Sequence, residues 1–301
     1  MERWLEYHIP DYMEGHKISE FLHQMRFSNQ NLAVLKRMPE SILINGSCEY
    51  MNYRLKKEDF LQVHIREEKI SQKIPPKSLP FSIVYEDEDI VVVNKPAGMP
   101  IHPSMNHYEN TLGNAAAYYY GQQNKAFVYR CINRLDKDTT GLTILAKHLV
   151  SGSILYDSMV KREIIREYFA IAEGADLPEA GTIDLPLGRK PDSAVERMVD
   201  MASGERAVTH YKVLGRKEGL AFLSLNLDTG RTHQIRVHMS AIGHPLIGDF
   251  LYNPENSLMK RQALHAGRLC FNHPISGKQI DLSAPIPEDM LMVFPEFRGY
   301  L

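Results

Sequence analysis

One carboxylate stands out by its neighbours. Residues 132–147, INRLDKDTTGLTILAK, place Asp136 directly after Arg134 and Leu135, and a Thr-Thr-Gly turn and a strand-like apolar run follow it. A carboxylate can attack an electrophile, take up a proton and leave again, so one presented at the start of a strand is a candidate nucleophile. The competing interpretation is a solvated loop aspartate, and the rest of the chain has to distinguish the two.

A second segment carries two arginines. Residues 228–249 read DTGRTHQIRVHMSAIGHPLIGD, and Ile235, Met239 and Ile242 recur at helical spacing. The pattern predicts a helix that begins at a cap formed by Asp228 or Thr229.

Arg231 and Arg236 are five positions apart, which is about 140° around a helix. They cannot face the same place, so one can face a phosphate while the other faces inward. An inward arginine needs a carboxylate, because an unpaired buried charge is strongly unfavourable. Asp136 is a candidate partner; a surface helix with two solvated arginines is the alternative.

Composition bounds the possibilities. The chain has 301 residues, 44% of them hydrophobic and 24% charged, with a net charge of −2. It contains no apolar run long enough to span a membrane. The charged N-terminus and three widely spaced cysteines predict a cytoplasmic protein. No metal-binding pattern occurs, so we expect neither a metal nor a cofactor.

A proline-rich stretch divides the chain. Residues 71–80, SQKIPPKSLP, have the composition of a linker, which predicts a unit at 1–72, a linker at 73–80 and a unit at 81–301. In the first unit, helical patterns at 17–25 and 29–38 precede short strands. Lys36 and Arg37 belong to a local excess of positive charge that can contact phosphates, or that can simply form a solvated helix face.

The second unit reads as a mixed α/β (α+β) domain. Strand patterns at 90–93, 141–147, 166–174 and 221–230 are not regularly separated by helices, which favours a mostly antiparallel sheet. The strand at 166–174, REYFAIAEG, contains Tyr168.

Five motifs in order resemble the RluA/RluD family of RNA pseudouridine synthases. They are VVVNKPAGMPIHP, NRLDKDTTGLTILAK, REYFAIAEG, TGRTHQIRVHMSAIGHPLIGD and LHAGRLCFNHPISG, and the resemblance covers residues 81–290. Residues 14–68 resemble an S4 RNA-binding domain. One departure is visible, because Asn133 stands where the family motif usually has His before Arg-Leu-Asp. Asn cannot titrate, which puts any role of this position in proton transfer in doubt.

The resemblance implies an isomerase that converts uridine to pseudouridine in RNA. It implies that Asp136 is the nucleophile, that Arg236 pairs with it, and that Tyr168 stacks on the uracil and moves a proton. It further implies that Arg134 fills the space of the flipped nucleotide or holds its phosphate.

The remaining RNA contacts expected are Arg231, Lys95, Lys36 and Arg37. Ribosomal RNA is the favoured partner and transfer RNA the other possibility, and the default oligomeric state is a monomer.

Two other functions stay open on sequence grounds. The chain can be an RNA-binding ribosome-assembly factor whose catalysis is lost or secondary. It can also be a glycoside hydrolase, which would need a second carboxylate, and Asp138 is the candidate.

Overall fold

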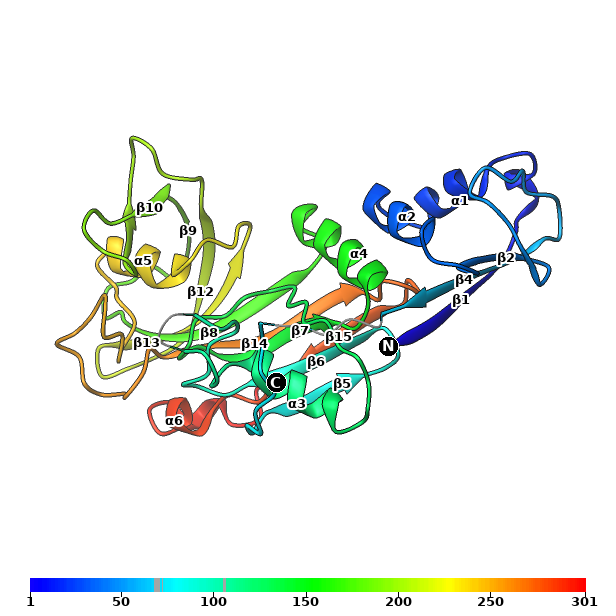
Figure 1. Cartoon of the computed structure of the whole chain (residues 1–301). Helices are drawn as coiled ribbons and strands as arrows, with labels where there is room; N and C mark the ends of the chain where they lie inside the picture. Colours follow the sequence, from blue (N-terminus) through cyan, green and yellow to red (C-terminus); the bar gives the residue numbers. More distant parts are fainter. Residues whose placement is uncertain (68–70, 72, 105–106) are drawn as a thin grey trace.

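The computed structural model describes residues 1–67, 71, 73–104 and 107–301. The N-terminal unit lies at one end of the elongated molecule (Figure 1) and is a four-stranded sheet, order β1-β4-β2-β3, with two helices packed on it. Its elements are β1 (Glu2–His8), η1 (Asp11–Met13), α1 (Ile18–Gln24), α2 (Asn29–Leu35), β2 (Ile42–Ile44), β3 (Ser47–Cys48) and β4 (Phe60–Arg66). Both predicted helices are present, and β2 turns into β3 at Asn45 and Gly46, which have positive φ angles of 50° and 82°.

Strand β1 was not predicted. It pairs antiparallel with the whole of β4, from Glu2 opposite Arg66 to His8 opposite Phe60. Only Leu5 of this strand is buried. An edge strand with one buried side chain has almost no period-two hydrophobic signal, so its sequence alone does not identify it.

The second unit is built on a nine-stranded sheet of order β5-β6-β7-β14-β8-β13-β12-β9, with β15 paired to β14. Every pairing in it is antiparallel except that of β14 with β7. This confirms the mixed, mostly antiparallel sheet. Its strands are β5 (Ser82–Glu86), β6 (Ile90–Lys95), β7 (Thr140–Ala146), β8 (Ile165–Glu173), β9 (Ala180–Asp184), β12 (Val208–Lys217), β13 (Leu220–Leu227), β14 (Leu264–Asn272) and β15 (Gln279–Ser283).

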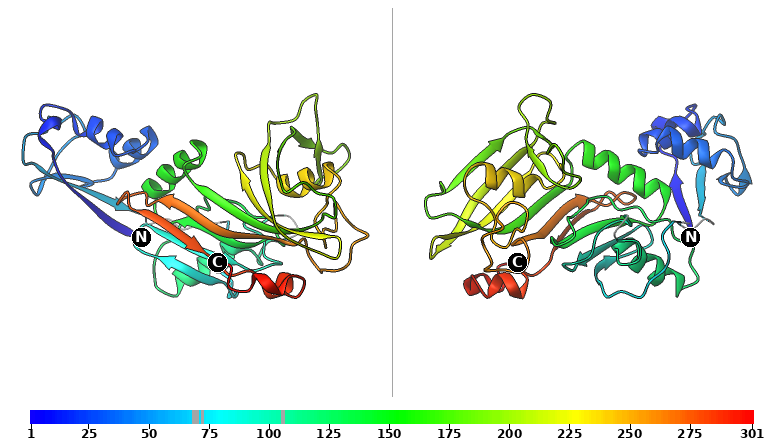
Figure 2. Two further views of the ribbon diagram at one scale, coloured as in Figure 1. Left: turned by 180° about the vertical axis from the view of Figure 1, so that it is seen from behind. Right: turned by 60° about the vertical axis from the view of Figure 1, so that its left-hand side comes forward.

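The helices of this unit are short and lie around the sheet (Figures 1 and 2). They are α3 (Leu112–Gly121), α4 (Leu149–Val160), α5 (Gln234–Ala241), α6 (Glu288–Leu291) and η2 (Pro295–Phe297), and a small hairpin is formed by β10 (Leu187–Arg189) and β11 (Arg197–Val199). No helix in the described ranges combines the length and the apolar character that crossing a membrane requires.

Helix α4 joins the two units. Its Val150 and Ile154 belong to the same hydrophobic core as α1 and α2. Arg26 adds ion pairs to Asp157 at 2.8 Å and Glu163 at 3.0 Å across the junction. The N-terminal unit is therefore packed against the large unit by apolar and charged contacts.

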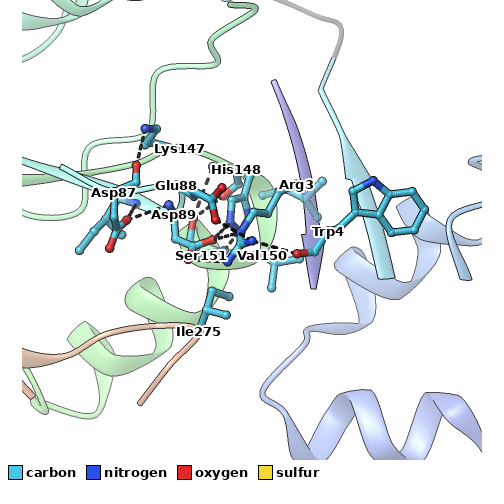
Figure 3. Close-up of polar contacts among 12 residues, drawn as sticks. Arg3, Trp4, Asp87, Glu88, Asp89, Lys147, His148, Val150, Ser151 and Ile275 are labelled. Carbon is cyan, nitrogen blue, oxygen red and sulfur yellow. Dashed lines mark hydrogen bonds and ion pairs between the residues drawn. The ribbon is translucent and has the colours of Figure 1, made fainter. Parts of the chain in front are cut away.

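A buried polar hub lies at the same junction (Figure 3). The carboxylate of Asp89, which is 4% exposed, accepts hydrogen bonds from Arg3 Nε of β1 and from His148 Nε2, each at 2.9 Å. His148 in turn accepts the backbone N–H of Ser151 through Nδ1 and so caps α4. One carboxylate thus connects three segments of the chain.

The predicted linker is packed rather than loose. The backbone N–H of Lys77 donates to Asn114 O at 3.1 Å, and Asn114 Nδ2 donates to Pro75 O at 2.7 Å, so this stretch lies against α3. Its proline composition reflects an extended path over a surface, which composition alone does not distinguish from a free linker. The predicted boundary at residue 72 lies outside the described residues.

Candidate active site

Strand β7 presents the loop that carries Asp136. At its start, Gly141 has φ +113°, and a Cβ there would lie 2.2 Å from Ala266 O on β14. Only glycine permits this close parallel approach. The loop before it is therefore fixed at the junction of β7 and β14, in the middle of the sheet.

Asn133 anchors the other side of this loop. Its side chain is 1% exposed; Nδ2 donates to Leu142 O at 2.9 Å and Oδ1 accepts from Ile144 N at 2.8 Å. Both ends of the amide are occupied by the backbone of β7. The position where this chain departs from the family motif thus holds the loop in place.

Helix α5 begins later than predicted. Its N-cap residue is His233 in the left-handed region, with φ 58° and no side-chain cap, so the predicted cap at Asp228 or Thr229 is wrong. Instead, Gln234 Oε1 accepts from Thr229 Oγ1 at 2.7 Å and from the backbone N–H of Arg231 at 3.0 Å. A side chain inside the helix organises the preceding turn, and cap rules do not anticipate this arrangement.

Arg236 faces inward from α5 and is 2% exposed. Its Nη1 donates to Asp136 Oδ2 at 3.2 Å, and the Asp136 side chain keeps 24% of its surface exposed. Its other edge binds Asp249, where Nε and Nη2 each lie 2.7 Å from a carboxylate oxygen. One guanidinium is thus shared between a half-open and a fully buried carboxylate.

The two carboxylates keep this arginine charged. Burial alone would lower the pKa of Arg236, but the hydrogen bonds and negative charge of Asp249, and then of Asp136, raise it. The rings of Phe250 and Tyr252 lie 5.7 and 5.1 Å from its Cζ atom, within cation–π range.

Tyr168 lines the same cleft as Asp136 and is 5% exposed. Burial raises the pKa of its hydroxyl, as does the charge of Asp136, while the neighbouring Arg166 lowers it. Arg166 lies two residues earlier on β8, and its Nε is buried without an acceptor among the described residues. A guanidinium N–H in this state has hydrogen-bonding capacity left for a ligand or water.

His233 also lines the cleft, and its Nε2 lies 4.0 Å from Asp136 Oδ2. The Tyr252 hydroxyl accepts the Arg197 N–H at 2.9 Å and lies 2.9 Å from His233 Nδ1. In the tautomer in which the Tyr252 hydroxyl donates to Nδ1, the imidazole proton is on Nε2, the nitrogen that lies toward Asp136. Burial lowers the pKa of His233, which favours the neutral ring.

The predicted RNA-contacting arginines divide into two kinds. Arg134 is exposed and makes no hydrogen bond or ion pair with the described residues. Arg231 also lines the cleft but is paired with Glu205 and donates from Nε to Arg206 O at 3.2 Å. Arg231 precedes α5 and Arg236 lies on it, so the two face different surroundings, and Arg236 is the inward one.

Lys95 does not fit its predicted role in RNA binding. Its side chain is 0% exposed, and Nζ donates to Pro96 O at 2.8 Å and Lys137 O at 2.9 Å. Burial lowers its pKa to about 7, against the opposing charges of Asp138 and Asp136. Lys95 connects the loop after β6 to the loop of Asp136. The predicted RNA contact is therefore wrong, because the side chain is buried and its sequence motif does not reveal this burial.

Lys36 and Arg37 are exposed, as expected, but they lie at the end of α2 in the N-terminal unit, away from α5 (Figure 1). They border a hollow of about 380 Å³ together with Tyr50. The structure does not bring them to the cleft.

A second carboxylate for glycoside hydrolysis is missing from the described lining of the cleft. Asp138 Oδ1 accepts the Gly98 N–H at 3.1 Å, and Asp249 has both oxygens on Arg236. Asp136 is thus the carboxylate that lines this cleft. The larger hollow of about 950 Å³, at the junction of the units, has acidic side chains that its basic ones do not outnumber, so it offers no excess of positive charge to RNA.

One group of side chains has the spacing of a metal site, namely Asp87, Asp89 and His273. His273 Nδ1 accepts the backbone N–H groups of Ile275 at 3.3 Å and Ser276 at 3.0 Å. Its ring proton is therefore on Nε2, which lies 2.9 Å from Asp87 Oδ2. Because Nδ1 accepts two backbone N–H groups, a metal on Nε2 would require the ring to lose its last proton, so the donor set does not fit a metal.

Three residues in or behind the cleft were not identified from sequence: His233, which lines it, Asp249, which binds Arg236, and Arg166, which neighbours Tyr168. All three lie inside quoted motifs, and their positions in the motifs were the available signal. Their roles depend on contacts between β8, α5 and the turn after it, which no single segment encodes.

Comparison with known proteins agrees with this geometry. The family model for RNA pseudouridylate synthase matches residues 89–241. The chain is 37% identical over 273 residues to the uncharacterized RNA pseudouridine synthase YjbO of Bacillus subtilis, covering 91% of this chain and 96% of that one. It is 36% identical over 302 residues to ribosomal large subunit pseudouridine synthase D of Escherichia coli K12, covering 95% and 91%.

A solved structure, human RNA pseudouridylate synthase domain containing 1, superposes with a TM-score of 0.58 at 26% identity and covers 70% of this chain and 85% of that chain. The motifs, the fold and these relatives agree, and the chain belongs to the RNA pseudouridine synthase family.

Proposed function

We propose that this protein isomerises specific uridines to pseudouridine in structured RNA, with Asp136 as the nucleophile. The observation that carries the proposal is the pairing of Asp136 with the buried Arg236 at 3.2 Å, in a cleft that Tyr168 also lines. The guanidinium gives the carboxylate a cationic hydrogen-bond partner, and the partly exposed side chain can still meet a substrate.

The chemistry requires no external reagent. The N1–C1′ bond of uridine breaks, the uracil turns, and C5 bonds to C1′, while the proton lost at C5 is matched by one gained at N1. Asp136 adds to the nucleotide and leaves again, and the Tyr168 hydroxyl takes part in the proton transfer. No metal or cofactor enters this scheme.

The uridine must leave its stack before it reacts. The enclosed part of the cleft measures about 50 Å³, room for one or two waters. Side chains at the mouth must therefore move when a base enters. We expect Arg134, exposed two residues before Asp136, to hold the phosphate or fill the vacated space. We expect Arg231 to contact RNA once it leaves Glu205.

The favoured substrate is large-subunit ribosomal RNA. The support is the 36% identity with an enzyme named for the large ribosomal subunit, over 95% of this chain. We also propose that the N-terminal unit is an S4-like RNA-binding domain that contacts phosphates through Lys36 and Arg37, which are exposed at the end of α2.

The test uses unmodified transcripts of large-subunit ribosomal RNA and of transfer RNA, incubated with the purified protein in the presence of a metal chelator. We expect pseudouridine at discrete positions of the ribosomal transcript, detected by mass spectrometry. Conversion of transfer RNA alone would overturn the proposed substrate. Tight RNA binding without any pseudouridine would favour the ribosome-assembly function instead.

A further inference from the structure

We propose that Asp249 is a positioning residue of the active site: it holds Arg236 by one edge so that a single guanidinium nitrogen is left for Asp136. The inference rests on the proposed function, because it assigns Asp136 as the nucleophile. The inference adds Asp249 to the residues of the active site, as one that touches no substrate and acts through Arg236.

The two contacts of Arg236 are unequal. Asp249 receives two hydrogen bonds of 2.7 Å, whereas Asp136 receives one of 3.2 Å. A bidentate guanidinium–carboxylate pair is directional and fixes the plane of the guanidinium. The direction of Nη1, and hence the place of the Asp136 contact, follows from the bond to Asp249.

Asp249 is itself firmly held. It is 0% exposed, and its Oδ1 also accepts the backbone N–H groups of Leu251 at 3.0 Å and Tyr252 at 3.2 Å. The preceding Gly248 has φ +69°, and a Cβ there would lie 2.2 Å from Arg261 O. The turn therefore has little freedom, and Asp249 transmits this rigidity to Arg236.

Charge gives the arrangement a second consequence. One cation faces two anions, and the shorter bidentate pair takes the larger share of its attraction. Asp136 therefore has a cationic partner without being locked in a bidentate pair of its own. A nucleophile needs this balance, because each strong hydrogen bond to its oxygens must be broken or weakened when it attacks.

The experiment measures single-turnover conversion of the ribosomal transcript with enzyme in saturating excess. Under these conditions a partly unfolded preparation leaves the rate constant unchanged, as long as the folded enzyme stays in saturating excess over the RNA. We expect Asp249→Asn to lower the rate constant roughly 100-fold, the effect of misplacing a catalytic contact by about 1 Å, with RNA affinity unchanged within about twofold. A rate constant within twofold of wild type overturns the proposal.

A double-mutant cycle with Arg236→Gln separates positioning from an independent role. If Asp249 acts through Arg236, the double variant reacts no more slowly than Arg236→Gln alone. Two losses that multiply overturn the proposal. If Asp249→Asn fails to fold, Arg236→Lys replaces it as the test. The lysine amine is a point charge and cannot hold both carboxylates in the same geometry. We therefore expect a large loss of rate, and a wild-type rate overturns the proposal.

A crystal structure of Asp249→Asn, or of Arg236→Lys if the first variant does not fold, makes the test independent of turnover. We expect the side chain at position 236 to leave the position it holds beside Asp136. Two results would overturn the positioning role of Asp249, whatever the substrate is. The first is an Arg236 side chain that has not moved in Asp249→Asn. The second, in Arg236→Lys, is a lysine amine at the former position of Nη1. Wild-type protein that makes no pseudouridine counts against the proposed function alone.

Discussion

The molecule buries charge in two places and uses it differently. At the junction of the units, the 4% exposed Asp89 is shared by Arg3 and His148 (Figure 3). In the cleft, the 2% exposed Arg236 is shared by Asp249 and Asp136. In each place one buried charged group makes hydrogen bonds with two partners: Asp89 accepts two, and Arg236 donates to two carboxylates.

The hub and the cleft differ in the hydrogen-bonding capacity that their groups have left. At the hub every partner is tied back into the fold, since His148 also caps α4 and Arg3 also donates to Trp4 O at 2.9 Å. In the cleft the chain of contacts ends on Asp136, which is 24% exposed and receives one hydrogen bond of 3.2 Å. Burial of charge therefore does not distinguish a site from a scaffold; spare bonding capacity at an accessible atom does.

Arg236→Ala should break the cleft most severely. It removes the charge that stabilises Asp136, so we expect the single-turnover rate to fall roughly 10²–10³-fold, with RNA affinity little changed. It also leaves the buried Asp249 unpaired, which should lower the free energy of unfolding by about 3–5 kcal/mol. The control is Arg298→Ala, which removes an exposed arginine paired with Glu288 and should keep the wild-type rate constant. Equal rates for Arg236→Ala and wild type would remove the proposed ion pair from the mechanism.

Tyr168→Phe should affect chemistry without affecting the packing of β8. The ring remains and only the hydroxyl is lost, so we expect a rate loss of roughly 100-fold if the hydroxyl moves a proton, with thermal stability nearly unchanged. Single-turnover kinetics beside a thermal melt decides this. A wild-type rate would restrict Tyr168 to stacking.

Asp89→Asn should lower the stability of the protein and leave its rate unchanged, unlike a substitution in the cleft. It breaks a buried charged contact, so we expect the free energy of unfolding to fall by about 3 kcal/mol with the rate constant unchanged. Asp157→Asn, which breaks the more exposed pair with Arg26, should lower it by less than about 1 kcal/mol. A large rate loss in Asp89→Asn would show that the hub and the cleft are coupled.

Acid should weaken the hub. Burial alone would raise the pKa of Asp89, but the hydrogen bonds of His148 and Arg3 lower it below the usual value of about 3.9. A depressed folded-state pKa contributes stability above about pH 4 that is lost as pH falls through the folded value. Chemical unfolding between pH 5 and 2 should show this loss in wild type and less of it in Asp89→Asn; identical slopes would contradict it.

Arg134→Ala should have the smallest effect. A phosphate contact contributes to affinity rather than to the chemical step, so we expect about a tenfold weaker RNA affinity and a salt-dependence slope lower by about 1. Lys36→Ala tests the N-terminal unit in the same titration. Affinity and slope equal to those of wild type would remove the mutated residue from the RNA interface.

Much of the local secondary structure is readable from sequence, because short-range signals agree. The helical spacing of Phe21 and Leu22, the Asn45-Gly46 turn and the apolar strand of β7 all appear where predicted. The choice of Arg236 as the partner of Asp136 came from the family resemblance; the separation of about 140° around a helix does not apply, because Arg231 precedes α5, which begins at Gln234.

The remainder depends on tertiary contacts. Asp249 becomes the main partner of Arg236 because the turn after α5 folds back against it, and Lys95 is buried because its loop packs on that of Asp136. Strand β1 exists because β4 offers it an edge. In each case the deciding partner is distant in the sequence, so residue type and spacing do not identify it.

The most direct test of the central claim is Asp136→Asn, assayed for pseudouridine in large-subunit ribosomal transcript at saturating enzyme. The side chain keeps its shape and loses its charge, so the variant should fold and bind RNA with an affinity near that of wild type. We predict no detectable pseudouridine from the variant and conversion by wild type in the same reaction. Equal conversion by both proteins would contradict the assignment of Asp136 as the nucleophile.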